Sequence, residues 1–512
     1  MNRKQLAKKV LGEGTCRRLA ACERSAKRAL SGWLAGVSPP QRALKWLRSS
    51  MDSALDHPVR RDGHQVDVAL MAQVAPTLSH YGEKETAERL VQRLLSLQRP
   101  DGSWAAPDGR SHLKATAAAL DALVRVGSQG EGSDEAVRRA QEVVYEKATE
   151  LLDRGVVPEA AGPLPLVAVT LLICAAEVPG TRGSEDLITR VAECLSGDQP
   201  AVPEAADAYK QIERADLLLR LGRDDAARPV LEAQETLQAT AEVTAAEAKN
   251  PSVCSACLAR LASCWYQVGV WHPADSALAR LEQNQQHSGA WRSGSCRNPA
   301  HGRDTGPLLA AKHYLDANRH RVVSYMDRMA DQLPRDVSSH DGRAQAVLQL
   351  VKPGDHVVEV GCGKGRFLRL IRQACPQSRC TGIDISAKLL AELGPEITAL
   401  EGWMEDIPCE DNHFDIVFSV EAVEHSANIE AAVRELVRIA KPGGWVLIID
   451  KQRSQWGRLP CPSWERWPSS RYLSRLLRND CAQVRCETVS YGRNPADGLI
   501  VAWQGRKGYP RP

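Results

Sequence analysis

The stretch VVEVGCGKGRF at residues 357–367 constrains the fold of this chain more than any other part of its sequence. Val357 and Val358 belong to a short apolar run typical of a buried strand, and glycines follow at positions 361, 363 and 365. Glycine leaves no side chain in the way where a chain turns from a strand into a helix. The spacing therefore predicts a strand, a tight turn and a helix, with a ligand close to the backbone of the turn.

Short apolar runs alternate with helical segments in the last third of the chain, beyond a polar stretch at residues 331–342. The runs that we expect to form strands are HVVEV, CTGI, ITAL, FDIVF and WVLII, followed by AQVRCETV and GLIVAWQ. Repeated strand and helix units favour a parallel, doubly wound sheet. The sequence therefore predicts a carboxy-terminal α/β Rossmann-like domain over residues 338–507, with a seven-stranded sheet.

The glycine spacing differs from that of dinucleotide-binding enzymes. In Glu359-x-Gly361-x-Gly363-x-Gly365 the third glycine comes one residue earlier than in Gly-x-Gly-x-x-Gly, and an acid precedes the first glycine. This pattern resembles motif I of the class I S-adenosylmethionine-dependent methyltransferases. The segments TGIDIS, GWMEDIP and AKPGGWVLII follow in the order of that family, and together they resemble methyltransferase type 11 and the ubiquinone O-methyltransferases.

The resemblance implies that S-adenosylmethionine is the cofactor. Asp384 is expected to accept its ribose hydroxyls, Asp406 to receive its adenine amino group, and Glu359 to orient its ammonium group. Trp403 stands where related sequences often carry a small or acidic residue, so its ring either flanks the adenine or fills core. The expected cofactor-binding residues are Glu359, Gly361, Gly363, Gly365, Asp384, Ile385, Asp406 and Ile407.

The segment EAVEH at residues 421–425 follows the fourth predicted strand, where a catalytic base would suit methyl transfer to oxygen. We expect His425 and Glu421 to be the catalytic residues. In the ubiquinone O-methyltransferases that the segment resembles, the corresponding Glu-x-x-Glu-His residues bind a divalent cation. Glu421, Glu424 and His425 are therefore also candidate metal ligands, although many related enzymes have this segment without metal. A base, a metal site and a purely structural role all stay open.

The segment at residues 450–480 is too long for a simple turn and is rich in basic and aromatic residues. This composition suggests an anionic acceptor that is partly flat or sugar-like, although an exposed charged lid is an equal interpretation. The candidate acceptor-binding residues are Lys451, Arg453, Trp456, Arg458 and Arg471.

Residues 60–330 are rich in Ala and Leu with helical spacing, which predicts an all-α domain. Two stretches, LLSLQRPDGSW at 94–104 and LARLEQNQQHSGAW at 278–291, each end a helix and continue with Gln, a glycine turn and Trp. This pattern resembles the turns of α/α toroids such as the squalene-hopene cyclases and the prenyltransferase β-subunit fold. No Asp-x-Asp-Asp cluster occurs in the sequence, which disfavours cyclase chemistry.

Residues 1–50 form a basic amphipathic arm, because residues 1–48 carry twelve Lys or Arg against two Glu. The arm could make a peripheral contact with an anionic membrane or touch nucleic acid, or it could be a helix packed on its own protein. Nucleic acid is not expected as a substrate, because no Asn-Pro-Pro-Tyr-type motif follows the fourth strand. The amino terminus lacks the apolar core of a signal peptide, and fifteen scattered cysteines suggest reduced thiols, so we expect a cytoplasmic protein.

These features predict a methyltransferase that transfers a methyl group from S-adenosylmethionine to a small molecule or to a glycan or lipid-linked acceptor, by O-methylation. One alternative is a carboxyl O-methyltransferase that acts on an acyl carrier or another acid. An alternative of another class is a helical binding or scaffold protein with a regulatory S-adenosylmethionine site.

Overall fold

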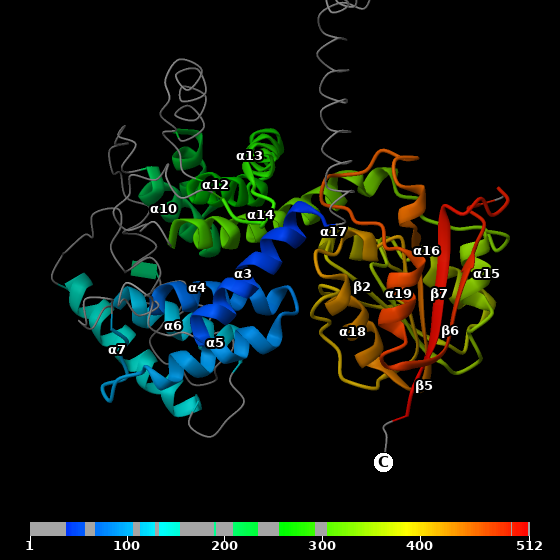
Figure 1. The fold of residues 1–512 in the computed structure, drawn as a ribbon, viewed down its shortest axis with the longest axis horizontal. Helices are drawn as coiled ribbons and strands as arrows, with labels where there is room; N and C mark the ends of the chain where they lie inside the picture. Colours follow the sequence, from blue (N-terminus) through cyan, green and yellow to red (C-terminus); the bar gives the residue numbers. More distant parts are fainter. Residues whose placement is uncertain are drawn as a thin grey trace, which may run out of the picture.

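The computed structural model describes the chain at residues 37–56, 67–105, 113–127, 133–153, 189–190, 208–233, 255–291, 305–492 and 494–509. Figure 1 shows a helical part, coloured blue to green, beside a sheet domain whose strands are coloured from yellow to red. In these described ranges, no helix has both the length and the apolar content needed to cross a membrane.

The sheet domain is built on one seven-stranded sheet with the order β3-β2-β1-β4-β5-β7-β6. Its strands are β1 (His356–Val360), β2 (Arg379–Asp384), β3 (Ile397–Glu401), β4 (Phe414–Val420), β5 (Ala440–Lys451), β6 (Cys481–Thr488) and β7 (Ile500–Lys507). Each coincides with a predicted run, which confirms the Rossmann-like α/β fold. The expected parallel arrangement holds for β1 to β5 only, since β7 runs antiparallel to β5 and β6. No helix is described between β6 and β7 that could carry the chain back across the sheet.

Helices cover both faces of this sheet, and each face has its own core. One core contains residues of α18 (Ile429–Ile439) and α19 (Ser470–Leu477), and the other contains residues of α15 (Gly342–Leu348) and α16 (Arg366–Ala374). The short α17 (Ala387–Leu390) follows β2. Val358 and Val360 of β1 point into the first core and Val357 into the second, because side chains alternate along a strand. A strand that is buried on both faces has a nearly continuous apolar sequence, and this pattern made β1 predictable from the sequence.

The helical part shares one core, to which the first half of its last long helix contributes, from Leu308 to Ala317. Its helices are α3 (Pro39–Asp56), α4 (Val68–His80), α5 (Lys84–Ser96), α6 (Leu113–Val126), α7 (Ser133–Asp153), α10 (Ala208–Arg220), α12 (Ser255–Gln267), α13 (Trp271–Asn284) and α14 (Thr305–Met329). A single 3-10 turn, η1 (Ala330–Gln332), continues α14 toward the sheet domain. α14 packs on α3, α4 and α12, so it connects the core of the helical part with the sheet domain.

The first of the two predicted Gln-Gly-Trp turns follows α5. Gln98 donates from Nε2 to the carbonyl of Gly102 at 3.1 Å, and the indole of Trp104 donates to the carbonyl of Leu94 at 2.7 Å. Gly102 has a φ of 84°, a conformation that favours glycine. The glutamine and the tryptophan thus tie the turn back to itself and to the helix that precedes it.

The second turn, after α13, repeats these contacts. Gln285 donates from Nε2 to the carbonyl of Gly289 at 3.1 Å, and the indole of Trp291 donates to the carbonyl of Leu281 at 2.9 Å. Gly289 has a φ of 98°. The shared hydrogen bonds give a physical reason for the recurrence of Gln, Gly and Trp, whereas closure of the helices into a toroid stays a prediction.

Residues 1–36 of the predicted basic arm lie outside the described residues. The remainder of that segment belongs to α3, whose Leu44 and Leu47 are buried in the helical core. Arg48 on the same helix pairs with Glu83 at 3.2 Å. Residues 39–50 therefore form a helix packed on its own protein, and the helical part begins before the predicted residue 60.

The turn between α4 and α5 fixes the helical part to the sheet domain. Asn428, which caps α18, donates from Nδ2 to the carbonyl of Tyr81 at 2.8 Å, and Arg434 of α18 donates to the carbonyl of Gly82 at 2.9 Å. Gly82 has a φ of 71°, and a Cβ built on it would lie 2.4 Å from the Cβ of Ala431. Two backbones can approach this closely only where one residue is glycine.

Gly82→Ala should destabilise the full chain more than Gly222→Ala does. The two glycines have φ values of 71° and 68°, so alanine is strained at either position by about 1–3 kcal/mol. A Cβ at Gly222 has no atom within 4 Å, whereas a Cβ at Gly82 collides with α18, and such overpacking costs about 1–3 kcal/mol more. Thermal unfolding midpoints of the two variants measure this difference. Equal unfolding midpoints would show that the turn at Gly82 does not make this close contact with α18 in solution.

Candidate functional site

A cavity of about 450 Å³ lies at the carboxyl ends of β1, β2 and β4. The sheet order runs outward from β1 in one direction to β2 and β3, and in the other direction to β4 and β5. Open α/β sheets bind ligands at the point where the order reverses in this way. One side of the cavity comes from the sheet domain, and a second side comes from α14 and η1 of the helical part.

The glycine turn after β1 forms part of the cavity wall. Gly361 has a φ of 78°, and a Cβ there would lie 2.3 Å from the Cβ of Ala422, in the turn after β4. Gly363 borders the cavity, and no atom lies within 4 Å of its Cβ position. Gly365 instead caps α16 outside the cavity, where a Cβ would strike Leu393 at 2.3 Å. The structure thus brings Gly361 and Gly363 to the cavity, while Gly365 shapes the start of the helix.

Two buried carboxylates, Glu359 and Asp384, border the cavity beside this turn. Asp384 accepts hydrogen bonds from the backbone N–H groups of Gly363 at 2.8 Å and Ser386 at 3.0 Å, and burial raises its pKa above the usual value. The Oε2 atom of Glu359 has no hydrogen-bond partner among the described residues, and burial raises the pKa of Glu359 well above its usual value. A buried carboxyl group without a partner is unfavourable unless a ligand supplies a donor or a cation.

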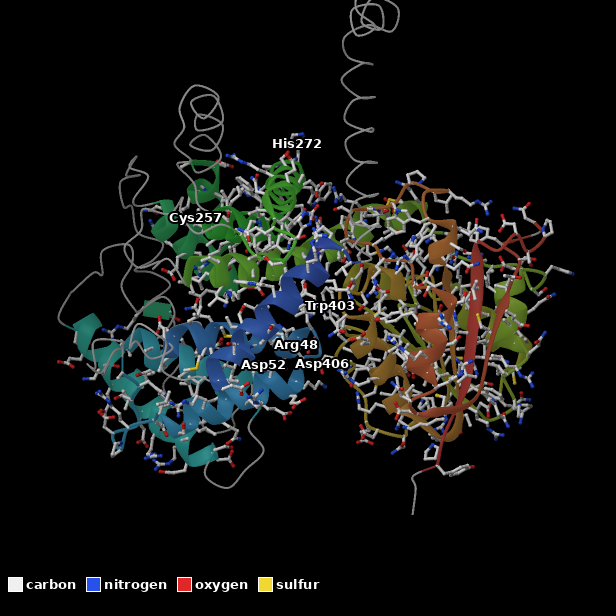
Figure 2. All side chains as sticks on the ribbon, viewed as in Figure 1. Arg48, Asp52, Cys257, His272, Trp403 and Asp406 are labelled. Atoms are coloured by element: carbon white, nitrogen blue, oxygen red, sulfur yellow. The ribbon has the colours of Figure 1, made fainter. Side chains whose placement is uncertain are left out.

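The segments after β2 and β3 contribute only some of their predicted residues. Ile385 and Trp403 border the cavity. Asp406 does not, because its carboxylate is half exposed and pairs with Lys84 of α5 at 2.9 Å. Ile407 is buried in the core that α18 covers. Figure 2 shows Trp403 and Asp406 where the sheet domain meets the helices. The position of Asp406 therefore gives no support to its predicted adenine contact.

Glu421 borders the cavity, but two guanidinium groups already hold its carboxylate. Arg343 contacts one oxygen, and Arg366 pairs with the same oxygen at 3.1 Å. The residue has a φ of 52°, a strained conformation for a side chain other than glycine. A carboxylate fixed in this way suits the positioning of neighbouring groups better than the catalytic role predicted for Glu421.

His425 borders the same cavity with its ring nitrogens uncommitted. Its Nε2 atom lies 3.7 Å from Glu424 and its Nδ1 atom lies 3.7 Å from Glu465, both beyond hydrogen-bonding distance. Burial lowers the pKa of His425 below its usual value, so the imidazole is neutral at pH 7. A neutral imidazole in this position can take a proton from an acceptor hydroxyl.

The possible metal-ligating group at this site is Glu424, His425 and Glu465, rather than the predicted set with Glu421. Their ligand atoms lie within 4.8 Å of one another. Glu424, however, is fully buried and already pairs with the ammonium group of Lys451, which a divalent cation would have to displace. Burial also raises the pKa of Glu465 to about 8, so this carboxyl group is mostly protonated at pH 7. The residues fit a metal ion poorly, and we assign none.

One residue of the predicted acceptor set, Lys451, reaches the cavity. The others do not border it: Arg453, Trp456, Arg458 and Arg471. Trp456 packs against the ring of Trp467, with their centroids 5.2 Å apart, and Arg458 pairs with the exposed Asp497 at 2.8 Å. The segment after β5 instead contributes Leu459, Pro460 and Glu465 to the wall.

The wall from α14 and η1 was not predicted. It presents apolar and aromatic side chains: Val322, Tyr325, Met326, Met329, Leu333 and Pro334. Val322, Tyr325, Met326 and Met329 recur at the three- and four-residue spacing of one face of α14, so the sequence carried a signal for this part of the wall. The predicted domain boundary at 331–342 concealed it, because that boundary assigned the face to the helical domain. The cavity is thus apolar along α14 and polar around His425.

Comparisons with known proteins find similarity to methyltransferases. Residues 358–448 match the family described as a methyltransferase domain. The chain is 29% identical over 170 residues to a malonyl-[acyl-carrier protein] O-methyltransferase of Pectobacterium atrosepticum, a match that covers 33% of this chain and 64% of the relative. It is 32% identical over 125 residues to the 2-methyl-6-phytyl-1,4-hydroquinone methyltransferase of a Synechocystis strain, covering 23% of this chain and 39% of that protein.

Each of these matches spans less than two thirds of the relative. A solved S-adenosylmethionine-dependent methyltransferase from Aquifex aeolicus aligns with 35% of this chain and 98% of its own, with 21% identity and a TM-score of 0.29. The family match begins within β1, includes β2 to β4 and ends within β5. Over residues 358–448, the carboxy-terminal domain of this chain is therefore similar to the S-adenosylmethionine-dependent methyltransferases.

Proposed function

We propose that the chain transfers the methyl group of S-adenosylmethionine to an oxygen atom of an acceptor with an apolar body, such as a lipid-linked small molecule. One observation carries this proposal: a single cavity joins the unpartnered Glu359 carboxyl group, the uncommitted His425 imidazole and the apolar face of α14. The first group suits the cofactor, the second suits a hydroxyl nucleophile, and the third suits an apolar acceptor.

The residues around the glycine turn fit S-adenosylmethionine. Glu359 would accept a hydrogen bond from the ammonium group and gain the cation that its buried position lacks. Asp384 would accept the ribose hydroxyls, since each of its oxygens has one backbone donor and keeps a further lone pair. The bound cofactor supplies an electrophilic methyl group. The protein then has to align the acceptor oxygen and remove its proton, which we assign to His425.

An acceptor carboxylate is the alternative, and the name of the Pectobacterium relative favours it. The charges around His425 argue for a neutral hydroxyl instead. Lys451 is paired with Glu424, and Arg366 is paired with Glu421. Neither of these two cations is free, and the third cation of the lining, Lys364, lies 3.8 Å from Glu392. An acceptor carboxylate would therefore have to compete with an existing carboxylate for its partner.

Transfer of label from methyl-labelled S-adenosylmethionine to fractionated host lipids, glycans and small molecules tests the proposal. We expect label in an apolar fraction and in a form stable to mild alkali, because a methyl ether resists hydrolysis whereas a methyl ester releases methanol. Asp384→Ala protein, in which we expect weakened cofactor binding, serves as the control and should transfer less label at a limiting cofactor concentration. Labelled methanol after alkali would favour a carboxyl acceptor. Cofactor binding without transfer to any fraction would favour a binding protein with a regulatory site.

Asp384→Ala should weaken S-adenosylmethionine binding about tenfold to a hundredfold, because ribose hydroxyls lose a charged acceptor worth roughly 1.5–3 kcal/mol. Asp406→Ala is the matched control, since it removes a carboxylate from the same domain that lies outside the cavity. Calorimetric titration of both variants measures the affinities. An equal loss in Asp406→Ala would restore the adenine contact that the sequence predicted for Asp406.

His425→Ala should lower turnover by about a hundredfold with little change in cofactor affinity, because proton removal acts in the transition state. Burial lowers the pKa of His425, so the rate should rise with pH through a value below the usual 6.5 and be level at pH 7. His413→Ala, at an exposed position at the other end of β4, is the control. Full turnover in His425→Ala, or loss of turnover on chelation, would contradict the assignment of His425 as a base.

A further inference from the structure

A second cavity, of about 490 Å³, lies among α4, α6, α10, α12 and α14 of the helical part. Its volume is within the range of small-molecule sites. Ile385 and Trp403 border both this cavity and the cofactor cavity, so they form a wall that the two share. The methyltransferase chemistry proposed above uses none of the helical residues that line this second cavity.

The charges in the second cavity balance. Its lining carries five Lys or Arg side chains and five Asp or Glu side chains, so the net formal charge is zero. Most of these charges are paired within the lining. Arg260 pairs with Asp216 at 2.8 Å, Lys312 with Asp316 at 2.8 Å, and Arg125 with Asp121 at 2.8 Å. An ionic ligand would therefore have to compete with existing ion pairs for a partner.

Three histidines add neutral polar groups to this lining. Burial lowers the pKa of His80 to about 4, and it also lowers the pKa values of His313 and His320, so all three are uncharged at pH 7. His313 is 3% exposed, and its Nε2 atom has no hydrogen-bond partner among the described residues. A buried polar atom in this state points to a ligand that is bound in the working protein.

We propose that this cavity is a second binding site, for an uncharged small molecule rich in hydroxyl groups, such as a saccharide. A hydroxyl group both donates and accepts, so it matches a lining that mixes guanidinium donors, carboxylate acceptors and neutral imidazoles. Gln73 on α4 adds an amide to the lining, and it is half buried. This site is separate from methyl transfer, and binding there does not require S-adenosylmethionine.

Calorimetric titration of the full chain with maltose and trehalose, without cofactor, tests the site, with glucose 6-phosphate as the charged comparison. We expect saturable binding of at least one uncharged sugar by the unmodified protein. His313→Phe should weaken that binding by at least about tenfold, and Gln73→Leu should weaken it severalfold, because each removes a hydrogen-bonding group from the lining. The control is His272→Phe, on the exposed surface of α13, which should bind like the unmodified protein.

Thermal unfolding separates a binding defect from a folding defect. Nε2 of His313 has no partner among the described residues, so the ligand-free His313→Phe protein should unfold at the same temperature as the unmodified protein or at a higher one. A saturating concentration of sugar should raise the unfolding midpoint of the unmodified protein but not that of the variant. If His313→Phe does not fold, the sugar affinity of Gln73→Leu tests the site instead. Three results would overturn the proposal. The first is that the unmodified protein binds neither sugar, and the second is that it binds glucose 6-phosphate more tightly than either sugar. The third result is equal sugar affinity in the Gln73 variant, the His313 variant and the His272 control.

Discussion

The stacking of Arg319 on Trp403 joins the two parts of this protein, and the shape of both cavities depends on it. Arg319 lies in the middle of α14, with its guanidinium carbon 3.7 Å from the centroid of the Trp403 ring, and it donates to the carbonyl of His80 at 2.8 Å. Burial removes much of the hydration of the Arg319 guanidinium and so lowers its pKa. A cation on an indole face and a hydrogen bond offset part of that loss. Since α14 continues from this contact toward η1, the stack sets where the apolar wall of the cofactor cavity stands.

Three of the groups that we assign to ligands share a physical property, since each has a buried polar atom that the described fold leaves unsatisfied. Oε2 of Glu359, Nδ1 of His425 and Nε2 of His313 are all buried without a hydrogen-bond partner among the described residues. Leaving such an atom unsatisfied costs about 1–3 kcal/mol. An apolar residue of the same shape would stabilise the ligand-free protein at each position. We infer that bound ligands supply the missing hydrogen-bond partners of these atoms, because residues at functional sites commonly lower the stability of the ligand-free protein.

The sequence was most informative where a residue's position follows from its neighbours along the chain. Apolar runs followed by turns located all seven strands, and residues directly after β1 and β2 reach the cavity because parallel strands end at one edge of the sheet. Asp406 failed this logic, because a lysine more than 300 residues earlier, Lys84, holds its carboxylate. Glu465 was missed for a similar reason, since it joins His425 only after the segment between β5 and α19 folds back over the end of β4. Contacts between distant segments leave no local pattern that a single sequence can show.

The division of the chain by fold differs from its division by function. Every described residue that suits the cofactor lies after the predicted boundary at residues 331–342, from Glu359 onward. The apolar wall that suits the acceptor comes before that boundary or at its start, from Val322 to Pro334. A sheet domain cut at residue 338 would therefore keep its cofactor residues and lose one side of its acceptor cavity. Under the proposed function, the helical part does more than support the sheet domain. Through α14 it would complete the surface on which the acceptor lies, and so it would help to decide which acceptor the methyl group can reach.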